Sequence, residues 1–215
     1  QILKSFFKIN NRQYKLINLT ENEGVANARQ IALEQAKTKY LLFVDSDDLP
    51  DEKLVEKEYK VICSDAKIMA VSSWLSYIDM NGNSIRGGFY LGSKTKEEFM
   101  SIAKKEKLIF LPIQTLFNRE IALKVGGFRL DGFPDSKPRY QDFCEDLDLW
   151  TRMSDLYENG YYIITIPESL YLYRKGNSGL SSNAVQMLLK MKFVKKNLKL
   201  RRAKLNEMIF LRCWM

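Results

Sequence analysis

The stretch that decides the fold is "YLLFVDSDDLPDE", residues 40–52. Its first five residues form a continuous apolar run, which is typical of a strand buried on both faces of a parallel sheet. Three aspartates, Asp45, Asp47 and Asp48, follow at once. Alternate residues of an extended segment point the same way, so Asp45 and Asp47 can reach toward one point. The stretch therefore predicts a carboxylate pair at the end of a buried strand.

The segments around this stretch alternate between strand and helix patterns. Residues 14–19 predict a short strand, and a helix is expected from near Gly24. Another helix follows Pro50, residues 67–73 predict a second buried strand, and the pair Asn81-Gly82 predicts a hairpin turn. We therefore expect an α/β fold, with helices packed on a mostly parallel sheet.

Composition limits the class of protein. The 215 residues are 46% hydrophobic, enough for a substantial core. The three cysteines, Cys63, Cys144 and Cys213, are widely separated, which favours free thiols in a reducing compartment. The sequence has no apolar run of about 18 residues and no signal segment at its start. These features predict a soluble, cytoplasmic protein.

The net charge of +8 belongs to the end of the chain. From Asn183 onward lie nine of the 34 basic residues and one of the 26 acidic residues, so the preceding part is neutral. An enzyme acting on nucleic acid is expected to spread positive charge along its working surface. We therefore expect no nucleic-acid partner.

The carboxylate pair suggests a chemistry. Ligands of α/β sheets bind at the carboxyl ends of the strands. Two hard oxygen ligands suit Mg²⁺ or Mn²⁺, whose shell is completed by substrate phosphates and water. The pattern thus indicates a site for a nucleotide diphosphate. A polar turn followed by a helix cap explains the same residues.

Four segments, in order along the chain, resemble the motifs of glycosyltransferase family 2. They are "ENEGVANARQIALEQAKTKYLLFVDSDDLP" (21–50), "TLFNREIALKVGGF" (115–128), "QDFCEDLDLWTRM" (141–153) and "YLYRKGNSGLSS" (171–182). The resemblance implies the GT-A fold, sugar transfer from a nucleotide-sugar donor, and a divalent metal. We expect the donor to be a UDP-sugar. The acceptor would be a saccharide or a lipid-linked saccharide.

The resemblance also implies roles for the donor side. Asp45 and Asp47 would hold Mn²⁺ or Mg²⁺, which acts as a Lewis acid on the phosphates. Arg29 either contacts phosphate, pairs with an aspartate of the motif, or is a surface arginine. Asp48 either binds the metal or orients the loop and caps the next helix. The further candidates for donor binding are Asn22, Gly24, Gly126 and Gly127, the last two of which can equally end a helix.

On the acceptor side, the resemblance places the proton-accepting carboxylate on Asp146, next to Glu145. The chain contains no histidine, so a carboxylate must remove the proton. Acidic residues that stabilise a helix start are the alternative. Trp150 can stack on a sugar or lie buried, and Arg174 is a further candidate for acceptor or phosphate contact.

The sequence departs from the family in several ways. The expected paired-aspartate strands do not precede residue 14, so we expect residues 1–182 to be a GT-A domain that lacks its first βαβ portion. Gln30 replaces a usual asparagine, and the Gln-x-x-Arg-Trp motif of processive synthases is absent, which favours single transfer. A non-catalytic remnant and a metal-dependent nucleotidyltransferase are the alternatives.

Residues 183–215 form a basic tail with two expected helices. Apolar residues such as Leu188 and Val194 alternate with lysines. This pattern suits an amphipathic segment on the anionic inner face of a membrane. A helix packed on the body, with a solvated basic face, is the alternative.

Overall fold

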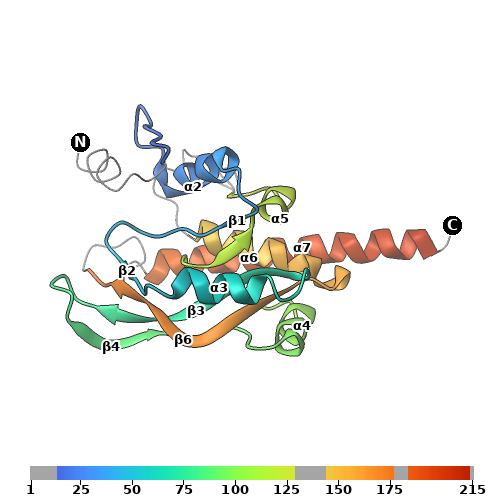
Figure 1. Ribbon diagram of the computed structural model, residues 1–215. Helices are drawn as coiled ribbons and strands as arrows, with labels where there is room; N and C mark the ends of the chain where they lie inside the picture. Colours follow the sequence, from blue (N-terminus) through green and yellow to red (C-terminus); the bar gives the residue numbers. More distant parts are fainter. Residues whose placement is uncertain (1–13, 129–143, 177–183, 214–215) are drawn as a thin grey trace.

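The computed structural model describes residues 14–128, 144–176 and 184–213 (Figure 1). The helices and strands within these ranges are, in chain order, α2 (Gly24–Gln35), β1 (Tyr40–Leu41), β2 (Leu49–Pro50), α3 (Leu54–Ile62), β3 (Ile68–Ile78), β4 (Ser84–Phe89), α4 (Lys96–Lys104), β5 (Leu116–Asn118), α5 (Arg119–Lys124), α6 (Glu145–Met153), the 3₁₀ helix η1 (Ser154–Asn159), β6 (Tyr162–Arg174) and α7 (Ala184–Cys213).

The described strands form one sheet in the order β1-β5-β3-β6-β2, with β4 paired to β3 outside this path. The two long strands, β3 and β6, run parallel. The other pairings among these strands are antiparallel, so the expected α/β layering is confirmed but the sheet is mixed and not mostly parallel. Antiparallel neighbours need only short connections. The chain returns from β3 to β4 through the predicted Asn81-Gly82 turn, where Gly82 has φ +89°.

Two predicted strands are wrong or shorter than expected. Residues 14–19 form no strand, and their apolar side chains, including Tyr14 and Leu16, are exposed. The buried strand expected at 40–44 is reduced to Tyr40–Leu41, which pairs with β5 alone. β5 is itself three residues long, so it limits the ladder. The apolar run consequently ends in exposed chain at Val44.

Helices cover both faces of the sheet. In Figure 1, α3 crosses in front of β3 and β6, whereas α6 and α7 lie behind them. α3 contacts β3 and β5 and buries Leu54 and Ile62. On the other side, the ring of Trp150 in α6 packs against Phe117 of β5, with 5.3 Å between ring centroids. α6 is thereby fixed near β5, which pairs with β1, the short strand that precedes the aspartates.

The tail is one continuous helix and not the expected pair. α7 runs from Ala184 to Cys213, and its last turns extend beyond the body (Figure 1). No glycine or proline interrupts this part of the sequence, so nothing breaks the helix. Among the described residues, no helix combines the length and apolar character needed to cross a membrane.

Candidate active site

Arg29 of α2 joins two of the predicted motifs. Its Nη2 donates to Oδ1 of Asp45 at 3.2 Å, and its Nη1 donates to Oε1 of Glu145 at the start of α6. The Arg29 side chain is only 12% exposed. The planar guanidinium can serve two carboxylates at once, which an ammonium group does less well. The predicted pairing of Arg29 with an aspartate of the motif is confirmed, and Arg29 is not a surface arginine.

The aspartate loop is held against the end of β6. The Asp48 side chain is buried, and its Oδ1 accepts from the backbone N–H of Arg174 at 2.7 Å. The Arg174 Nε donates in turn to the backbone oxygen of Asp47 at 2.7 Å. The Tyr171 hydroxyl accepts from the Asp45 N–H at 3.2 Å. Asp48 and Arg174 thus position the loop. Asp48 does not cap α3, whose N-cap residue is Lys53 and whose start has no side-chain cap.

The Gly-Gly-Phe segment is bound from two sides. Gln30 of α2 accepts from the Phe128 N–H through Oε1 at 2.7 Å. Arg152 of α6 donates to the backbone oxygens of Val125 and Gly127, at 2.5 Å each. Gly127 has φ +61°, and a Cβ on it would lie 2.2 Å from Oε1 of Gln30. A side chain is strained there by the positive φ, and its Cβ would displace the Gln30 amide that binds the Phe128 N–H.

Gly126 and Gly127 also end α5, as the alternative interpretation held. Their N–H groups donate to the backbone oxygens of Leu123 and Ala122. At the start of α2, Oδ1 of Asn22 accepts from the Gly24 N–H at 3.0 Å, and Gly24 has φ +81°. Asn22 and Gly24 therefore shape the helix start that carries Arg29.

The first two carboxylates of α6, Glu145 and Asp146, differ in access. Glu145 is buried, whereas Asp146 is partly exposed and its Oδ1 accepts from the Leu147 N–H at 2.7 Å. Burial is the main cause that raises the pKa of both carboxyl groups, and the Arg29 guanidinium opposes the rise. The Asp45 carboxylate adds to the rise in the pKa of Asp146. Asp45, Arg29 and the α6 carboxylates therefore form one electrostatic unit.

Two side chains, Asp45 and Asp47, are the metal ligands proposed from the sequence. Among the described residues, no group of three or more histidine, cysteine, aspartate or glutamate side chains could enclose a metal ion. Asp47 is exposed, and the side chain of Asp45 is 40% exposed. Two accessible hard oxygen donors fit a Mg²⁺ or Mn²⁺ ion that takes the rest of its ligands from substrate phosphates and water.

The Trp150 ring has no exposed face on which a sugar could stack. It is completely buried in the core, so burial and not sugar stacking describes its position. The predicted free thiols are confirmed for Cys63 and Cys144, and Cys213 lies among residues whose side chains are not described.

Three residues that hold the site received no role from the sequence: Gln30, Arg152 and Tyr171. Arg152 could have been found, because it lies four residues after Asp148 on one helix and binds it through Nε at 2.8 Å. Gln30 contacts Phe128, 98 residues away. No local pattern signals such a contact.

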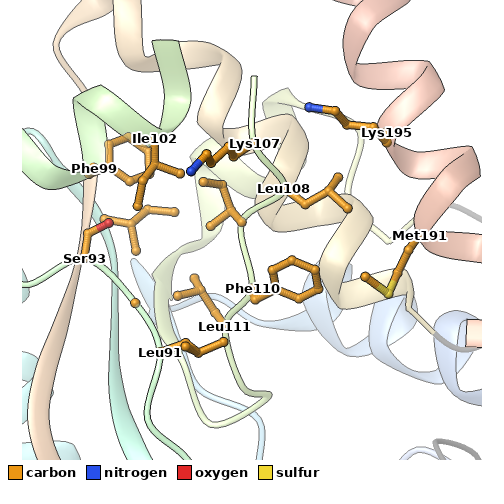
Figure 2. A pocket seen from close by; sticks show the side chains of 13 residues that line it. Leu91, Ser93, Phe99, Ile102, Lys107, Leu108, Phe110, Leu111, Met191 and Lys195 are labelled. Carbon is orange, nitrogen blue, oxygen red and sulfur yellow. The ribbon is translucent and has the colours of Figure 1, made fainter. Parts of the chain in front are cut away.

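An apolar cavity of about 690 Å³ lies apart from these motifs (Figure 2). Its walls come from the loop before α4, α4 itself, the segment 107–111, β6 and α7, and none of the described lining residues is a carboxylate. Lys107 and Lys195 are its charged lining residues. None of the predicted site residues lines this cavity.

The fold and the linked motifs define a class, the GT-A glycosyltransferases, and solved structures of this class are similar to the chain. TarS of S. aureus in complex with UDP-GlcNAc matches with a TM-score of 0.58 and 19% identity, covering 86% of this chain and 49% of that one. The mannosyltransferase PcManGT of Pyrobaculum calidifontis, in complex with GDP-Man and Mn²⁺, matches with a TM-score of 0.53 and 20% identity, covering 83% and 44%.

The chain belongs to glycosyltransferase family 2, whose sequence model matches residues 1–126. An uncharacterized glycosyltransferase of Methanocaldococcus jannaschii is 28% identical over 159 residues, 73% of this chain and 49% of that protein. Glycosyltransferase GlyG of Streptococcus pneumoniae is 22% identical over 186 residues, 81% of this chain and 56% of that protein. The chain thus spans about half the length of these relatives.

Proposed function

We propose that this chain forms catalytic machinery of an inverting, non-processive glycosyltransferase. It would move a sugar from a nucleotide-diphosphate sugar, a UDP-sugar, to a hydroxyl of a saccharide or lipid-linked acceptor. The observation that carries the proposal is the Arg29 bridge, since it brings the aspartate motif and the α6 carboxylates together. The family membership and the UDP-GlcNAc and GDP-Man complexes of the structural neighbours support it.

The proposed reaction is an in-line displacement at the anomeric carbon. The acceptor oxygen forms the new bond to carbon, its proton passes to the Asp146 carboxylate, and the bond from carbon to the phosphate oxygen breaks. Both electrons of that bond leave with the nucleoside diphosphate. Asp146 is the better candidate for the base because it is partly exposed, whereas Glu145 is buried against Arg29. A raised pKa suits a general base, since its conjugate acid is then closer to the working pH.

The leaving diphosphate needs positive charge beside it. Asp45 and Asp47 would hold Mn²⁺ or Mg²⁺, and the bound ion would supply Lewis-acid stabilisation of the phosphate oxygens. Arg29 positions Asp45 through its contact with Oδ1, and Glu145 positions Arg29. Asn22, Gly24, Asp48, Gly126 and Gly127 would shape the donor site through the backbone, as their hydrogen bonds and φ angles indicate.

The proposal is tested by incubating the chain with UDP-sugars, Mn²⁺ and saccharide acceptors while free UDP and product configuration are measured. We expect transfer with inversion, and we expect Asp146→Asn to lower the rate by at least about a hundredfold while leaving UDP binding intact. Glu158→Gln, on an exposed residue of η1, is the matched control. Retention of configuration, or full activity of Asp146→Asn, would overturn the assignment.

Two other classes give different results in the same assay. A nucleotidyltransferase would consume a nucleoside triphosphate and release pyrophosphate. A non-catalytic remnant would bind no nucleotide. UDP release from a UDP-sugar that depends on Asp146 distinguishes the proposed enzyme from both.

A further inference from the structure

One side of α7 is fixed to the body. Val194, Leu198 and Arg202, spaced four residues apart, are all buried. The Arg202 Nε and the Arg201 Nε each donate to the carboxylate of Asp155 in η1, both at 2.6 Å. These contacts set the rotation of the helix about its axis. The face opposite Val194 and Leu198 must therefore point away from the body.

The outward face combines apolar and basic side chains. With about 100° between successive residues, it is made of Val185, Leu188, Leu189, Lys192, Lys196, Lys199 and Leu200. Its apolar members are well exposed: Val185 69%, Leu188 56%, Leu189 60% and Leu200 52%. Its three lysines are exposed as well. We call these seven residues the outward face.

The outward face is distinct from the sides of α7 that already have partners. Met191 and Lys195 turn toward the cavity of Figure 2, and Lys195 donates to the backbone oxygen of Glu106. Val194 and Leu198 enter the body. None of the seven outward residues lines the cavity.

The charge of this face has one sign. The sequence has no aspartate or glutamate between Glu168 and Glu207, so α7 supplies no acidic neighbour to Lys192, Lys196 or Lys199 at helical spacing. A second copy of the chain would bring a matching set of lysines against these three, which like charges disfavour. A partner must instead offer negative charge and accept apolar side chains over the length of the helix.

We propose that the outward face of α7 docks on an anionic lipid bilayer. Val185, Leu188 and Leu189 would enter the boundary between headgroups and acyl chains. Lys192, Lys196 and Lys199 would meet lipid phosphates, with their aliphatic stems along the apolar surface. A bilayer offers negative headgroups and an apolar interior along the whole outward face. A folded acidic protein surface combines the two less uniformly. The proposal is independent of the proposed activity.

The test is sedimentation of the 215-residue chain with vesicles of phosphatidylglycerol and phosphatidylcholine, compared with phosphatidylcholine alone, at low and high salt. We expect binding to the anionic vesicles that weakens with salt. The triple variant Lys192→Gln, Lys196→Gln, Lys199→Gln should bind at least about tenfold more weakly, because each lysine near an anionic surface adds electrostatic attraction. Leu188→Gln with Leu189→Gln should also weaken binding.

The matched control changes the same charge elsewhere, in the exposed lysines Lys37, Lys53 and Lys60. Circular dichroism confirms that each variant is folded. Equal loss of binding in the control and in the α7 variant would reduce the effect to net charge and overturn the proposal. So would failure of the parent chain to sediment, or a stable dimer in light scattering that the leucine substitutions abolish.

Discussion

The Arg29 guanidinium holds two carboxylates of like charge close together. Asp45 and Glu145 come from motifs 100 residues apart, and each contacts one end of the same guanidinium. A single cation between them offsets the repulsion that a cluster of carboxylates would otherwise suffer. Arg29 therefore contacts Asp45 and Glu145 and also lowers the pKa of the Glu145 and Asp146 carboxyl groups.

Removing this cation should change the pH dependence of activity. Arg29 lowers the pKa of Glu145 and Asp146, so Arg29→Gln should raise both values. The base would then remain protonated to higher pH, so the acidic limb of the activity profile should move to higher pH. UDP release from a UDP-sugar, measured against pH, checks the shift. Arg86→Gln, on an exposed residue of β4, should leave the limb in place; an unchanged limb in Arg29→Gln would contradict the account.

Gly127 is a second residue of the site at which a substitution should have a measurable cost. Gly127→Ala would place a methyl group against Gln30 Oε1 in addition to the strain of a positive φ. Gly160→Ala is the matched control, since Gly160 has φ +80° with nothing within 4 Å of the added Cβ. The control should lose about 1 kcal/mol of unfolding free energy, and Gly127→Ala should lose at least about 1 kcal/mol more. Urea unfolding measures both. Equal losses of unfolding free energy in the two variants would mean that the Gln30 side chain moves aside without cost.

At the scale of elements, how far the sequence predicts the structure depends on the range of the contacts. The helix from Gly24, the hairpin at Asn81-Gly82 and the helix start at Glu145 were predicted, because local spacing and turn chemistry determine them. The strand at 14–19 was not formed, since a strand needs a pairing partner that its own residues do not specify. Two helices were also expected from the sequence in residues 183–215, where the structure has the single helix α7. At the site, the Arg29–Asp45 pairing was anticipated, whereas the Gln30–Phe128 bond depends on the tertiary fold.

α3 carries a buried acid that should make stability depend on pH. Burial raises the pKa of Glu58 from about 4.5 to about 9, although its Oε2 accepts from the Leu116 N–H. The folded state therefore holds a proton that the unfolded state releases. This contribution to stability is complete below about pH 4.5 and falls until about pH 9, by up to about 1.4 kcal/mol per pH unit.

Glu58→Gln removes that titration. The difference in unfolding free energy, variant minus parent, should rise steadily between about pH 5 and about pH 8. Urea unfolding at several pH values measures this difference. Glu56→Gln, on an exposed residue of the same helix, should show no such trend. A constant difference across this range for Glu58→Gln would show that Glu58 is already neutral or equally solvated in both states.

One carboxylate, Asp155, binds two arginines of α7. Asp155 of η1 accepts from Arg201 and Arg202, and Arg202 is 5% exposed. Asp155→Ala leaves a buried guanidinium without its carboxylate and should cost about 3 kcal/mol of unfolding free energy. Thermal unfolding and hydrogen exchange of α7 measure the loss. Glu158→Ala, on the same 3₁₀ helix but exposed, is the control, and equal effects of the two changes would contradict the anchoring role.

At the scale of the whole molecule, the four family motifs are joined by hydrogen bonds. Arg29 joins the first to the third, Gln30 joins the first to the second, and Arg152 joins the second to the third. Arg174 and Asp48 tie the fourth to the aspartate loop. The motifs are dispersed in sequence yet form one connected unit, which is the arrangement expected of a shared donor and acceptor site.

The most direct test of this account is calorimetric titration of the chain with UDP, with and without Mn²⁺. We predict binding that requires Mn²⁺ and is lost in Asp47→Asn, whose exposed side chain leaves the fold intact. Asp51→Asn, on an exposed aspartate outside the motif, should bind as the parent does. Equal affinity of all three proteins, or binding indifferent to the metal, would contradict a donor site built on Asp45 and Asp47.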